Sequence, residues 1–305
     1  MTPATSYHNP VLLRQSVDGL DIDPSGVYVD VTFGGGGHSR EILSRLGDQG
    51  RLYAFDQDLD ALRNDIDDDR FTLINENFGY MKRFLRFHGV KEVDGILADL
   101  GVSSHQFDEA SRGFSTRFDA KLDMRMNQNS SLDAIKVINH YEETDLIRIF
   151  KEYGELRNAY KLSRSIVEAR SIKPIKTIAR LKQVCAPLVP ARIEHKLMAQ
   201  VFQAIRIEVN NEMQVLKDFL VQSREILKPG GRLSVISYHS LEDRPVKRFM
   251  RNGLFDGEPE RDVFGRVEVP FKKIGKLVVP DAEEIKLNNR ARSAKLRVAV
   301  RTEQA

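Results

Sequence analysis

Four consecutive glycines, Gly34–Gly37, constrain this chain more than any other segment. They follow the β-type run YVDVTF (28–33) and lead into the helical run SREILSRLG (39–47). Glycine lets the backbone approach a ligand closely, and a strand, glycine turn and helix in that order are typical of nucleotide-binding α/β folds. The strict dinucleotide spacing Gly-x-Gly-x-x-Gly fails, because Ser39 or Arg40 takes the place of the last glycine. The segment predicts a ligand site and argues against a dinucleotide.

The first hundred residues alternate short apolar runs with amphipathic helical ones. LYAFD (52–56) and VDGILADL (93–100) are predicted strands, and the alternation indicates a mainly parallel sheet. The pattern returns near the end of the chain, where a helical segment over about 193–227 stops at Lys228-Pro229-Gly230-Gly231. The apolar run RLSVISY (232–238) follows as a further strand.

Between residues 102 and 200 the strand pattern gives way to a polar loop and helical runs. This segment leaves the sheet after Asp99, at the carboxyl ends of the strands, where open α/β sheets bind ligands. We therefore expect an α/β sheet domain formed by residues 1–101 and 201–305, and a helical insertion domain of residues 102–200 that recognises the substrate. The run AKLRVAVR (294–301) is predicted to add an edge strand.

The sequence lacks features that several classes of protein require. The sequence has no run of about eighteen apolar residues, and its N-terminus lacks the regions of a secretory signal, so we expect a cytoplasmic protein without a membrane partner. The single cysteine, Cys185, excludes an internal disulfide and a multi-cysteine zinc site, and its helical surroundings favour core packing. No metal site is expected.

Basic residues are concentrated in two segments, although the net charge is only +3. Residues 157–196 hold ten Lys or Arg against two acids, and residues 286–301 hold six and no acid. Two such segments indicate a polyanionic partner, whereas a solvated helix face or a soluble tail would explain either one alone. The candidate phosphate contacts are Arg290, Arg292, Lys295 and Arg297 in the second segment, with Lys161, Arg164, Arg170, Lys173 and Lys176 in the first.

Two acids end predicted strands. Asp56 follows Gly37 by nineteen residues, where a carboxylate can accept hydrogen bonds from both ribose hydroxyls of an adenosine. Asp99 would face the crevice of the sheet, although a turn or cap role is the plainer alternative. The turn LKPGGRL (227–233) resembles the late turn of Rossmann-like methyltransferases, whereas His38 could merely cap the following helix.

Taken in order, these segments closely resemble the RsmH (MraW) family, the 16S ribosomal RNA cytosine-N4 methyltransferases, over nearly the full length. The motifs that carry the resemblance are HNPVLL (8–13), DVTFGGGGHS (30–39), ADLGVSSHQFD (98–108), RGFS (112–115), LDMRM (122–126), FQAIRIEVNNE (202–212), SYHSLEDRPVK (237–247) and NNRARSAKLR (288–297). Three positions depart from the pattern: His105 and Asn289 stand where proline is expected, and Tyr238 stands where phenylalanine is expected.

The resemblance implies a Rossmann-like class I methyltransferase sheet with a helical insertion domain. It implies S-adenosylmethionine as cofactor and, as substrate, a cytidine of 16S rRNA in the decoding region of the small ribosomal subunit. Carried over by position, the cofactor contacts fall on Gly36, Gly37, His38, Asp56, Phe78, Asp99 and Gln106. Phe78 would pack on the adenine, although a lone aromatic is more often part of the core.

The usual motif for an amine substrate, Asp/Asn/Ser-Pro-Pro-aromatic, is absent, because Leu100-Gly101-Val102-Ser103-Ser104 follows Asp99. We expect Asp99, helped by Ser103, either to accept a hydrogen bond from the target amine or to fix the methionine amino group. A second group after the strand SVISY could grip a flipped base, with a structural turn as the alternative: Tyr238, His239, Ser240, Glu242 and Asp243. The catalytic candidates are Asp99, Ser103 and His239.

Two other functions stay open on the sequence alone. A noncatalytic small-subunit binding or assembly factor could retain the fold, although it would not need Asp56. A nicotinamide oxidoreductase fits less well, given the failed glycine spacing. The target nucleotide, the state of the RNA substrate and the oligomeric state, a homodimer included, leave no signal in the sequence.

Overall fold

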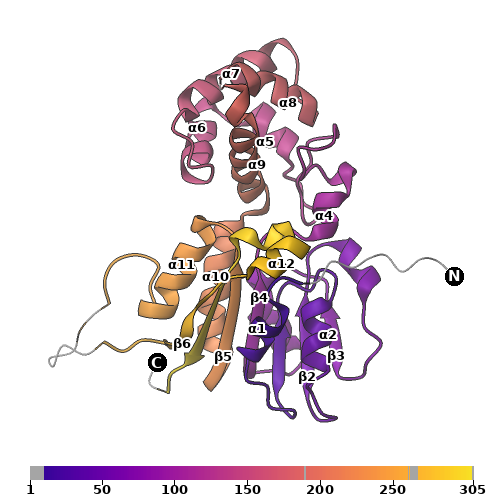
Figure 1. Ribbon diagram of the computed structural model, residues 1–305, viewed down its shortest axis with the longest axis vertical. Coiled ribbons are helices and arrows are strands. Elements are labelled where there is room, and N and C mark those ends of the chain that lie inside the picture. The colour runs from indigo at the N-terminus through magenta and orange to yellow at the C-terminus, as the bar shows by residue number, and fades with distance from the viewer. Residues whose placement is uncertain (1–9, 189, 260, 262–266, 304–305) are drawn as a thin grey trace. The chain divides into compact units, whose positions relative to one another are not determined.

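The computed structural model describes residues 10–188, 190–259, 261 and 267–303. The chain divides into two compact units, one comprising the residues up to Gly101 and from Met213, the other Val102–Glu212. We call them the sheet unit and the helical unit (Figure 1). The first boundary lies at the expected place, but the second lies at Glu212 and not at residue 200.

The later boundary has a physical cause in one helix break. The helical segment expected over 193–227 is two helices, α9 (Glu194–Asn210) and α10 (Glu212–Ile226). Asn211 separates them in the left-handed conformation, with φ of 50°. Val201 and Phe202 of α9 belong to the core of the helical unit, so the whole helix counts with that unit.

Within the described residues the sheet unit is built on a seven-stranded sheet of order β3-β2-β1-β4-β5-β7-β6. The strands are β1 (Val27–Asp30), β2 (Arg51–Phe55), β3 (Phe71–Ile74), β4 (Val93–Asp99), β5 (Leu227–Ser237), β6 (Phe271–Val278) and β7 (Lys295–Arg301). The first five are parallel, whereas β7 is antiparallel to both β5 and β6.

The prediction of an edge strand over 294–301 was therefore wrong in position, because β7 lies inside the sheet and β6 forms the edge. The outer strand escaped sequence analysis because most of its residues are exposed and three of its eight residues are lysines. Lys272, Lys273 and Lys276 of β6 point to solvent, as is common where an edge must not pair with another chain.

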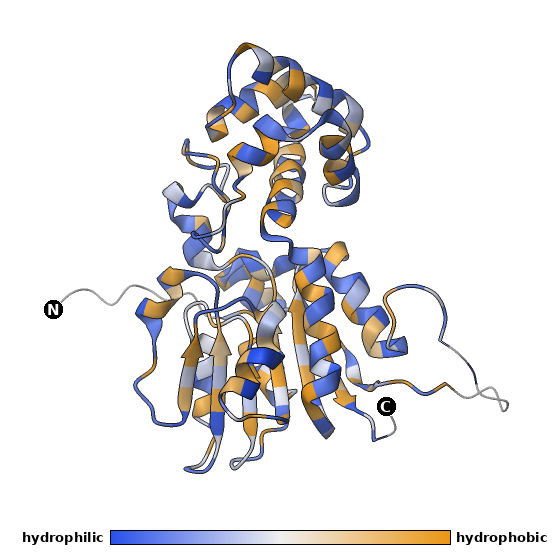
Figure 2. Ribbon diagram, turned by 180° about the vertical axis from the view of Figure 1, so that it is seen from behind, coloured by the Kyte–Doolittle hydropathy of each residue, from blue (hydrophilic) through white to orange (hydrophobic). Residues whose placement is uncertain are grey.

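Helices cover both faces of the sheet. On one face α1 (Leu13–Asp18) and α2 (Gly37–Leu43) contribute to a core with Tyr28 and Leu97. On the other, α3 (Met81–Phe87), α10 and α11 (Ser240–Asn252) pack on Val29 and its neighbours. The strands are coloured largely as hydrophobic, and the helices alternate between both colours, as amphipathic elements do (Figure 2). The Rossmann-like α/β fold is thus confirmed.

Shorter elements complete the sheet unit. They are helix α12 (Ala282–Leu287) and the 3-10 turns η1 (Leu59–Asn64), η2 (Phe78–Tyr80) and η6 (Asn289–Ser293). Within the ranges that the structure describes, no helix combines the length and apolar composition needed to cross a membrane.

The helical unit has its own hydrophobic core. Its helices are α4 (Ser104–Asp108), α5 (Ala134–His140), α6 (Glu143–Glu152), α7 (Ala159–Ile172), α8 (Ile178–Cys185) and α9, with the 3-10 turns η3 (Ala110–Arg112), η4 (Ala186–Leu188) and η5 (Ala191–Ile193). Cys185 is buried in this core, and burial raises the pKa of its thiol to about 12. It packs as a small apolar side chain, as expected.

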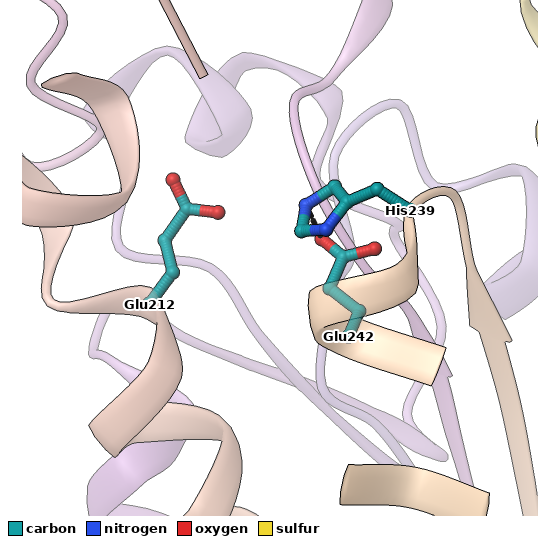
Figure 3. Close-up of side chains that lie close together, drawn as sticks. All are labelled: Glu212, His239 and Glu242. Carbon is teal, nitrogen blue, oxygen red and sulfur yellow. Dashed lines mark ion pairs between the residues drawn. The ribbon is translucent and has the colours of Figure 1, made fainter. Parts of the chain in front are cut away.

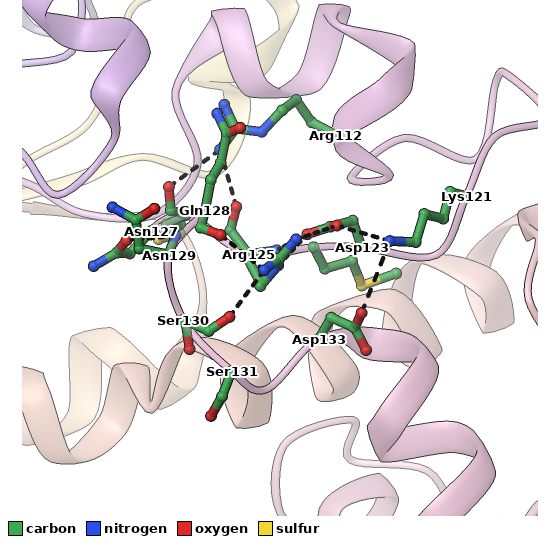
Figure 4. Close-up of polar contacts among 12 residues, drawn as sticks. Arg112, Lys121, Asp123, Arg125, Asn127, Gln128, Asn129, Ser130, Ser131 and Asp133 are labelled. Atoms are coloured by element: carbon green, nitrogen blue, oxygen red, sulfur yellow. Dashed lines mark hydrogen bonds and ion pairs between the residues drawn. The ribbon is translucent and has the colours of Figure 1, made fainter.

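Three sequence motifs of the helical unit meet around the turn LDMRM (122–126). Met124 is fully buried and has a φ of 60°, an unusual conformation for a residue other than glycine. Arg112 of RGFS donates to the carbonyl groups of Arg125 and Met126, at 2.9 and 3.1 Å (Figure 4). Asn210 of α9 accepts from the Met126 amide at 2.7 Å and donates to the Met124 carbonyl at 2.8 Å. These bonds stabilise the turn against its backbone strain.

Replacing Asn210 with Ala should destabilise the protein by about 2–3 kcal/mol, since the bonds to Met124 and Met126 are lost and their backbone groups are left unpaired. Urea unfolding followed by circular dichroism measures the change. Asn129→Ala is the matched control, because that side chain is exposed on the same loop, and it should change stability by less than about 0.5 kcal/mol. Equal midpoints for the two variants would contradict the role given to Asn210.

Candidate active site

The glycine turn is shaped by close contacts at two of its glycines. Gly36 has a φ of 75°, and a Cβ atom there would lie 2.9 Å from the Phe33 ring. A Cβ atom on Gly37 would lie 2.1 Å from Cγ of Pro10, so no larger residue fits. Pro10 belongs to the motif HNPVLL, whose first residues, His8 and Asn9, lie outside the described part of the chain. The N-terminal motif thus packs directly against the turn.

Asp30, at the end of β1, ties this turn to the helix that follows it. The carboxylate is completely buried and accepts from the Ser39 hydroxyl at 2.7 Å and from the Thr32 amide at 3.0 Å. Burial raises the pKa of Asp30, and these two hydrogen bonds oppose the rise. The Thr32 hydroxyl in turn accepts from the Asp99 amide at 2.7 Å, which joins β1 to β4. Sequence analysis missed this role, although an acid directly before a glycine turn was a visible signal.

Asp56 follows the end of β2 and lies beside the glycine turn. One carboxylate oxygen accepts from the Gly34 amide and the other from the Asp58 amide, each at 2.8 Å. Burial raises the pKa of Asp56 to about 6, and the two backbone hydrogen bonds hold it down. Because a carboxylate oxygen can accept two hydrogen bonds, each oxygen retains room for a further donor from a ligand.

Asp99 ends β4 and is held by a residue far away in the sequence. Tyr238 follows β5, and its hydroxyl donates to Oδ1 of Asp99 at 2.7 Å. Burial raises the pKa of Asp99 to about 6, while the nearby His38 and this hydrogen bond oppose the rise. Burial and Asp99 keep the pKa of Tyr238 well above its usual value, so the phenol stays protonated and acts as the donor.

His38 faces the other oxygen of Asp99. Its Nε2 lies 3.2 Å from the Val11 carbonyl oxygen, which can only accept, so Nε2 carries the proton. Burial lowers the pKa of His38 and favours the neutral ring. The remaining nitrogen, Nδ1, is then a bare acceptor 3.9 Å from Oδ2 of Asp99. Two acceptors at this distance form an electron-rich corner, which we call the acceptor corner, and it suits an N–H donor.

Phe78 lies in η2, on the same side of the sheet as α10. Its ring is half-buried and meets Phe219 of α10 edge-on, with 5.5 Å between the ring centroids. Asn77, just before it, donates from its amide to the Gln57 side chain at 2.9 Å. Phe78 therefore extends from the hydrophobic core of the sheet unit, and its proposed contact with a ligand stays a prediction.

The side chains of His239 and Glu242 contact each other at the start of α11. The Nε2 of His239 lies 2.9 Å from Oε1 of Glu242, and the other oxygen of Glu242 accepts from the Tyr238 amide at 2.8 Å (Figure 3). Glu242 is almost fully buried. The group SYHSLED thus forms a structured helix start, with Tyr238 turned toward Asp99. Glu212, also drawn in Figure 3, ends the helical unit and is bound there by Arg206 at 2.8 Å.

Ser103 and Gln106 form a capping box in the helical unit. The Ser103 hydroxyl accepts from the Gln106 amide at 3.2 Å, and the Gln106 side chain accepts from the Ser103 amide at 3.1 Å. Both side chains thereby start α4, so their predicted catalytic and cofactor roles would have to be added to this one. His105 lies in the first turn of α4, where proline also fits because amides there have no partner within the helix.

The basic candidates differ in their surroundings. Arg297 forms a two-pronged pair with Asp243, at 2.7 and 3.0 Å, and Lys295 lies 3.7 Å from the same carboxylate. Arg170 donates to two backbone carbonyl groups at the end of α5, those of Ile138 and Tyr141. The structure thus gives Arg297 and Arg170 internal partners.

The remaining candidates from the sequence lie closer to solvent. The exposed ones are Lys161, Arg164, Lys173, Lys176 and Arg292, whereas Arg290 is half-buried. Asn289 is the first residue of η6, a position that accepts proline as readily.

Replacing Tyr238 with Phe should raise the pKa of Asp99 above its value of about 6, because a hydrogen bond to the ionised form is lost. Carboxyl-carbon NMR of Asp-labelled protein measures the titration, and Asp99→Asn assigns the signal. The exposed Tyr80 supplies the control Tyr80→Phe, which should leave the midpoint unchanged. An Asp99 midpoint that is the same in wild type and Tyr238→Phe would disprove the effect.

Known proteins resemble this chain over nearly its whole length. A "Ribosomal RNA small subunit methyltransferase H" of Flavobacterium johnsoniae is 69% identical over 98% of this chain and 99% of its own. Proteins of the same name from Christiangramia forsetii and Bacteroides fragilis are 67% and 57% identical, over 96% and 97% of this chain and 97% of each of theirs. A putative methyltransferase of Streptococcus mutans, solved with SAH, is 13% identical with a TM-score of 0.43, over 95% of this chain and 97% of that one.

The match to a protein family also covers nearly the whole chain. The MraW methylase family matches residues 5–302, which include the glycine turn, the three strand-end carboxylates and the start of α11. The chain belongs to the MraW methylase family.

Proposed function

We propose that this protein transfers a methyl group from S-adenosylmethionine to the exocyclic N4 amine of a cytidine in 16S rRNA, in the decoding region of the small ribosomal subunit. A relative named ribosomal RNA small subunit methyltransferase H is 69% identical over 98% of the chain, and this similarity supports the proposal. The observation that carries the chemistry is the acceptor corner of Asp99 and His38 at the carboxyl edge of the sheet.

The residues of the sheet unit fit an adenosine-containing cofactor. Gly36 and Gly37 keep the turn free of side chains, and Asp56 can accept from ribose hydroxyls with the lone pairs that its two backbone bonds leave. Phe78 offers an aromatic surface beside these residues in the proposed arrangement. Bound S-adenosylmethionine supplies an electrophilic methyl group on a sulfonium.

The acceptor corner addresses the difficulty of the reaction. The lone pair of a cytosine amine is delocalised into the ring, so the amine reacts only when it is oriented and polarised. In the proposed arrangement, Oδ2 of Asp99 and Nδ1 of His38 accept hydrogen bonds from the two N–H groups of the amine. Tyr238 holds Asp99 in place and Val11 holds His38. Ionised Asp99 also stabilises the positive charge that develops on the nitrogen, and it accepts the proton that the nitrogen loses as the methyl group is transferred from the sulfonium.

The helical unit is the proposed substrate-recognition part. Arg125 fixes the loop after LDMRM by donating to the carbonyl groups of Gln128 and Ser130, at 2.7 and 2.9 Å (Figure 4). The loop carries the amide and hydroxyl side chains of residues 127–131, groups that can pair with the edges of unstacked RNA bases. Arg290 and Arg292 are proposed to contact phosphate groups, together with Lys295, whereas Arg297 supports α11 through Asp243.

The experiment that tests this function is mass spectrometry of nucleosides from small-subunit rRNA of cells with and without the gene. We expect N4-methylated cytidine to disappear in the deletion strain and to return with wild-type protein but not with Asp99→Ala. Unchanged methylation in the deletion strain would contradict the proposal and favour a noncatalytic assembly factor.

Methyl transfer should fall at acid pH because Asp99 must be ionised. Its folded-state pKa of about 6 lies above the usual value, so the carboxylate takes up its proton as the pH falls through about 6, and the rate should drop roughly tenfold per unit below that. Burial lowers the pKa of the neighbouring His38, which favours the neutral ring.

Asp99→Asn should lower kcat at least about a hundredfold and remove the acid limb that titrates near pH 6. Wild type and variant are compared in single-turnover assays, with cofactor affinity measured by calorimetry. A variant that keeps the wild-type kcat and loses only cofactor affinity would move Asp99 from the target amine to the methionine amino group.

A further inference from the structure

Helix α11 carries basic residues on its outer face. Arg244, Lys247, Arg248 and Arg251 are all exposed, and their spacing of i, i+3, i+4 and i+7 places them on one side of the helix. The opposite side is buried: Val246, Phe249 and Met250 belong to the core of the sheet unit. Packing therefore orients the helix, and the four cations are directed to solvent together. We call them the α11 basic face.

The α11 basic face lines a hollow. The four basic side chains, with Asn252 and Glu258, surround a cavity of about 240 Å³. Amide and guanidinium N–H groups around a concave surface are donors suited to phosphate oxygens. From Arg244 to Arg251 the helix rises by about 10 Å, which lets the face reach more than one phosphate of a nucleic-acid strand.

The acids of α11 do not neutralise this face. Glu242 is held by His239 at 2.9 Å, and Asp243 by Arg297 at 2.7 Å, and both acids are buried. Exposed Asp256 lies 3.3 Å from Arg248, but solvent screens a pair this exposed. Glu258 lines the hollow as well, so among these described residues four cations stand against two acids, Asp256 and Glu258, and the net charge is positive.

A helix face of this kind is unfavourable without a partner. Like charges three or four residues apart destabilise a helix, and ordinary solvated faces mix both signs. An anion with repeated charges removes this repulsion, which is the complementarity that a phosphate backbone offers. The pattern also lies outside the two basic segments that the sequence analysis identified.

We propose that the α11 basic face binds the phosphate backbone of the RNA substrate, as a contact surface of the sheet unit separate from the acceptor corner. The inference rests on the proposed function and adds to it where the RNA is held. Phosphate contacts carry no base information, so this surface contributes affinity and orientation to substrate binding.

The test is the salt dependence of binding to small ribosomal subunits purified from cells that lack the protein. Lys247→Gln/Arg251→Gln removes two cations of the face and keeps good helix formers. Arg83→Gln/Arg86→Gln on α3 is the matched control, because it removes two exposed cations from another helix of the same unit. Cofactor affinity, measured by calorimetry, should be unchanged in both variants and shows that they are folded.

We expect the α11 variant to bind at least about tenfold more weakly at low salt, and the slope of log K against log salt to fall by about 1.4, or 0.7 for each lost contact. The control variant should bind like wild type. Equal slopes for wild type and the α11 variant, or equal losses in both variants, would overturn the inference. If wild type binds the subunits but transfers no methyl group to them, the proposed function fails while the binding surface can still be judged.

Discussion

Three carboxylates at the carboxyl ends of neighbouring parallel strands govern the organisation of the sheet unit. Asp30 ends β1, Asp56 follows β2 and Asp99 ends β4. Burial raises the pKa of all three carboxyl groups. Burying charge at this edge is costly unless backbone and hydroxyl donors surround it. The glycine turn supplies the Gly34 amide to Asp56, and the helix after it supplies the Ser39 hydroxyl to Asp30. Asp99 receives its hydrogen bond from the Tyr238 hydroxyl.

These carboxylates differ in whether their oxygens are used within the protein or keep the capacity to accept further hydrogen bonds. The carboxylate oxygens of Asp30 accept hydrogen bonds from within the protein, and these bonds set the position of the glycine turn. Asp56 and Asp99 are only partly satisfied, so they keep acceptor capacity on the side where a ligand would lie. Asp30 and the two acids proposed to bind ligands thus differ in how many donors the fold provides to each, and not in residue type.

Much of this arrangement could be predicted from local sequence. The strand runs, the glycine turn and the two acids Asp56 and Asp99 follow patterns that depend on neighbours only a few residues away. The break at Asn211 could not be seen, because the apolar periodicity of α9 continues into α10 and a left-handed residue leaves no pattern. Strand β6 was hidden by its exposed lysines.

Contacts between distant residues limited the prediction of the site most. Tyr238 was grouped with its neighbours as a candidate for gripping a base, yet its hydroxyl bonds to Asp99, 139 residues away in the chain. Arg297 had the charge expected of a phosphate contact, but its partner Asp243 lies 54 residues earlier. Charge and spacing reveal what a side chain can bind, and only the fold shows which partner occupies it.

The helical unit interrupts the sheet unit in the chain, and this order has a consequence for synthesis. Strand β4 ends at Asp99, whereas its neighbour β5 begins at Leu227, after the whole of Val102–Glu212 has been made. The helical unit is contiguous and can fold as soon as it leaves the ribosome, while β4 must wait with one edge unpaired. Throughout the interval of translation between β4 and β5, the nascent chain therefore carries a strand edge that is open to wrong pairing.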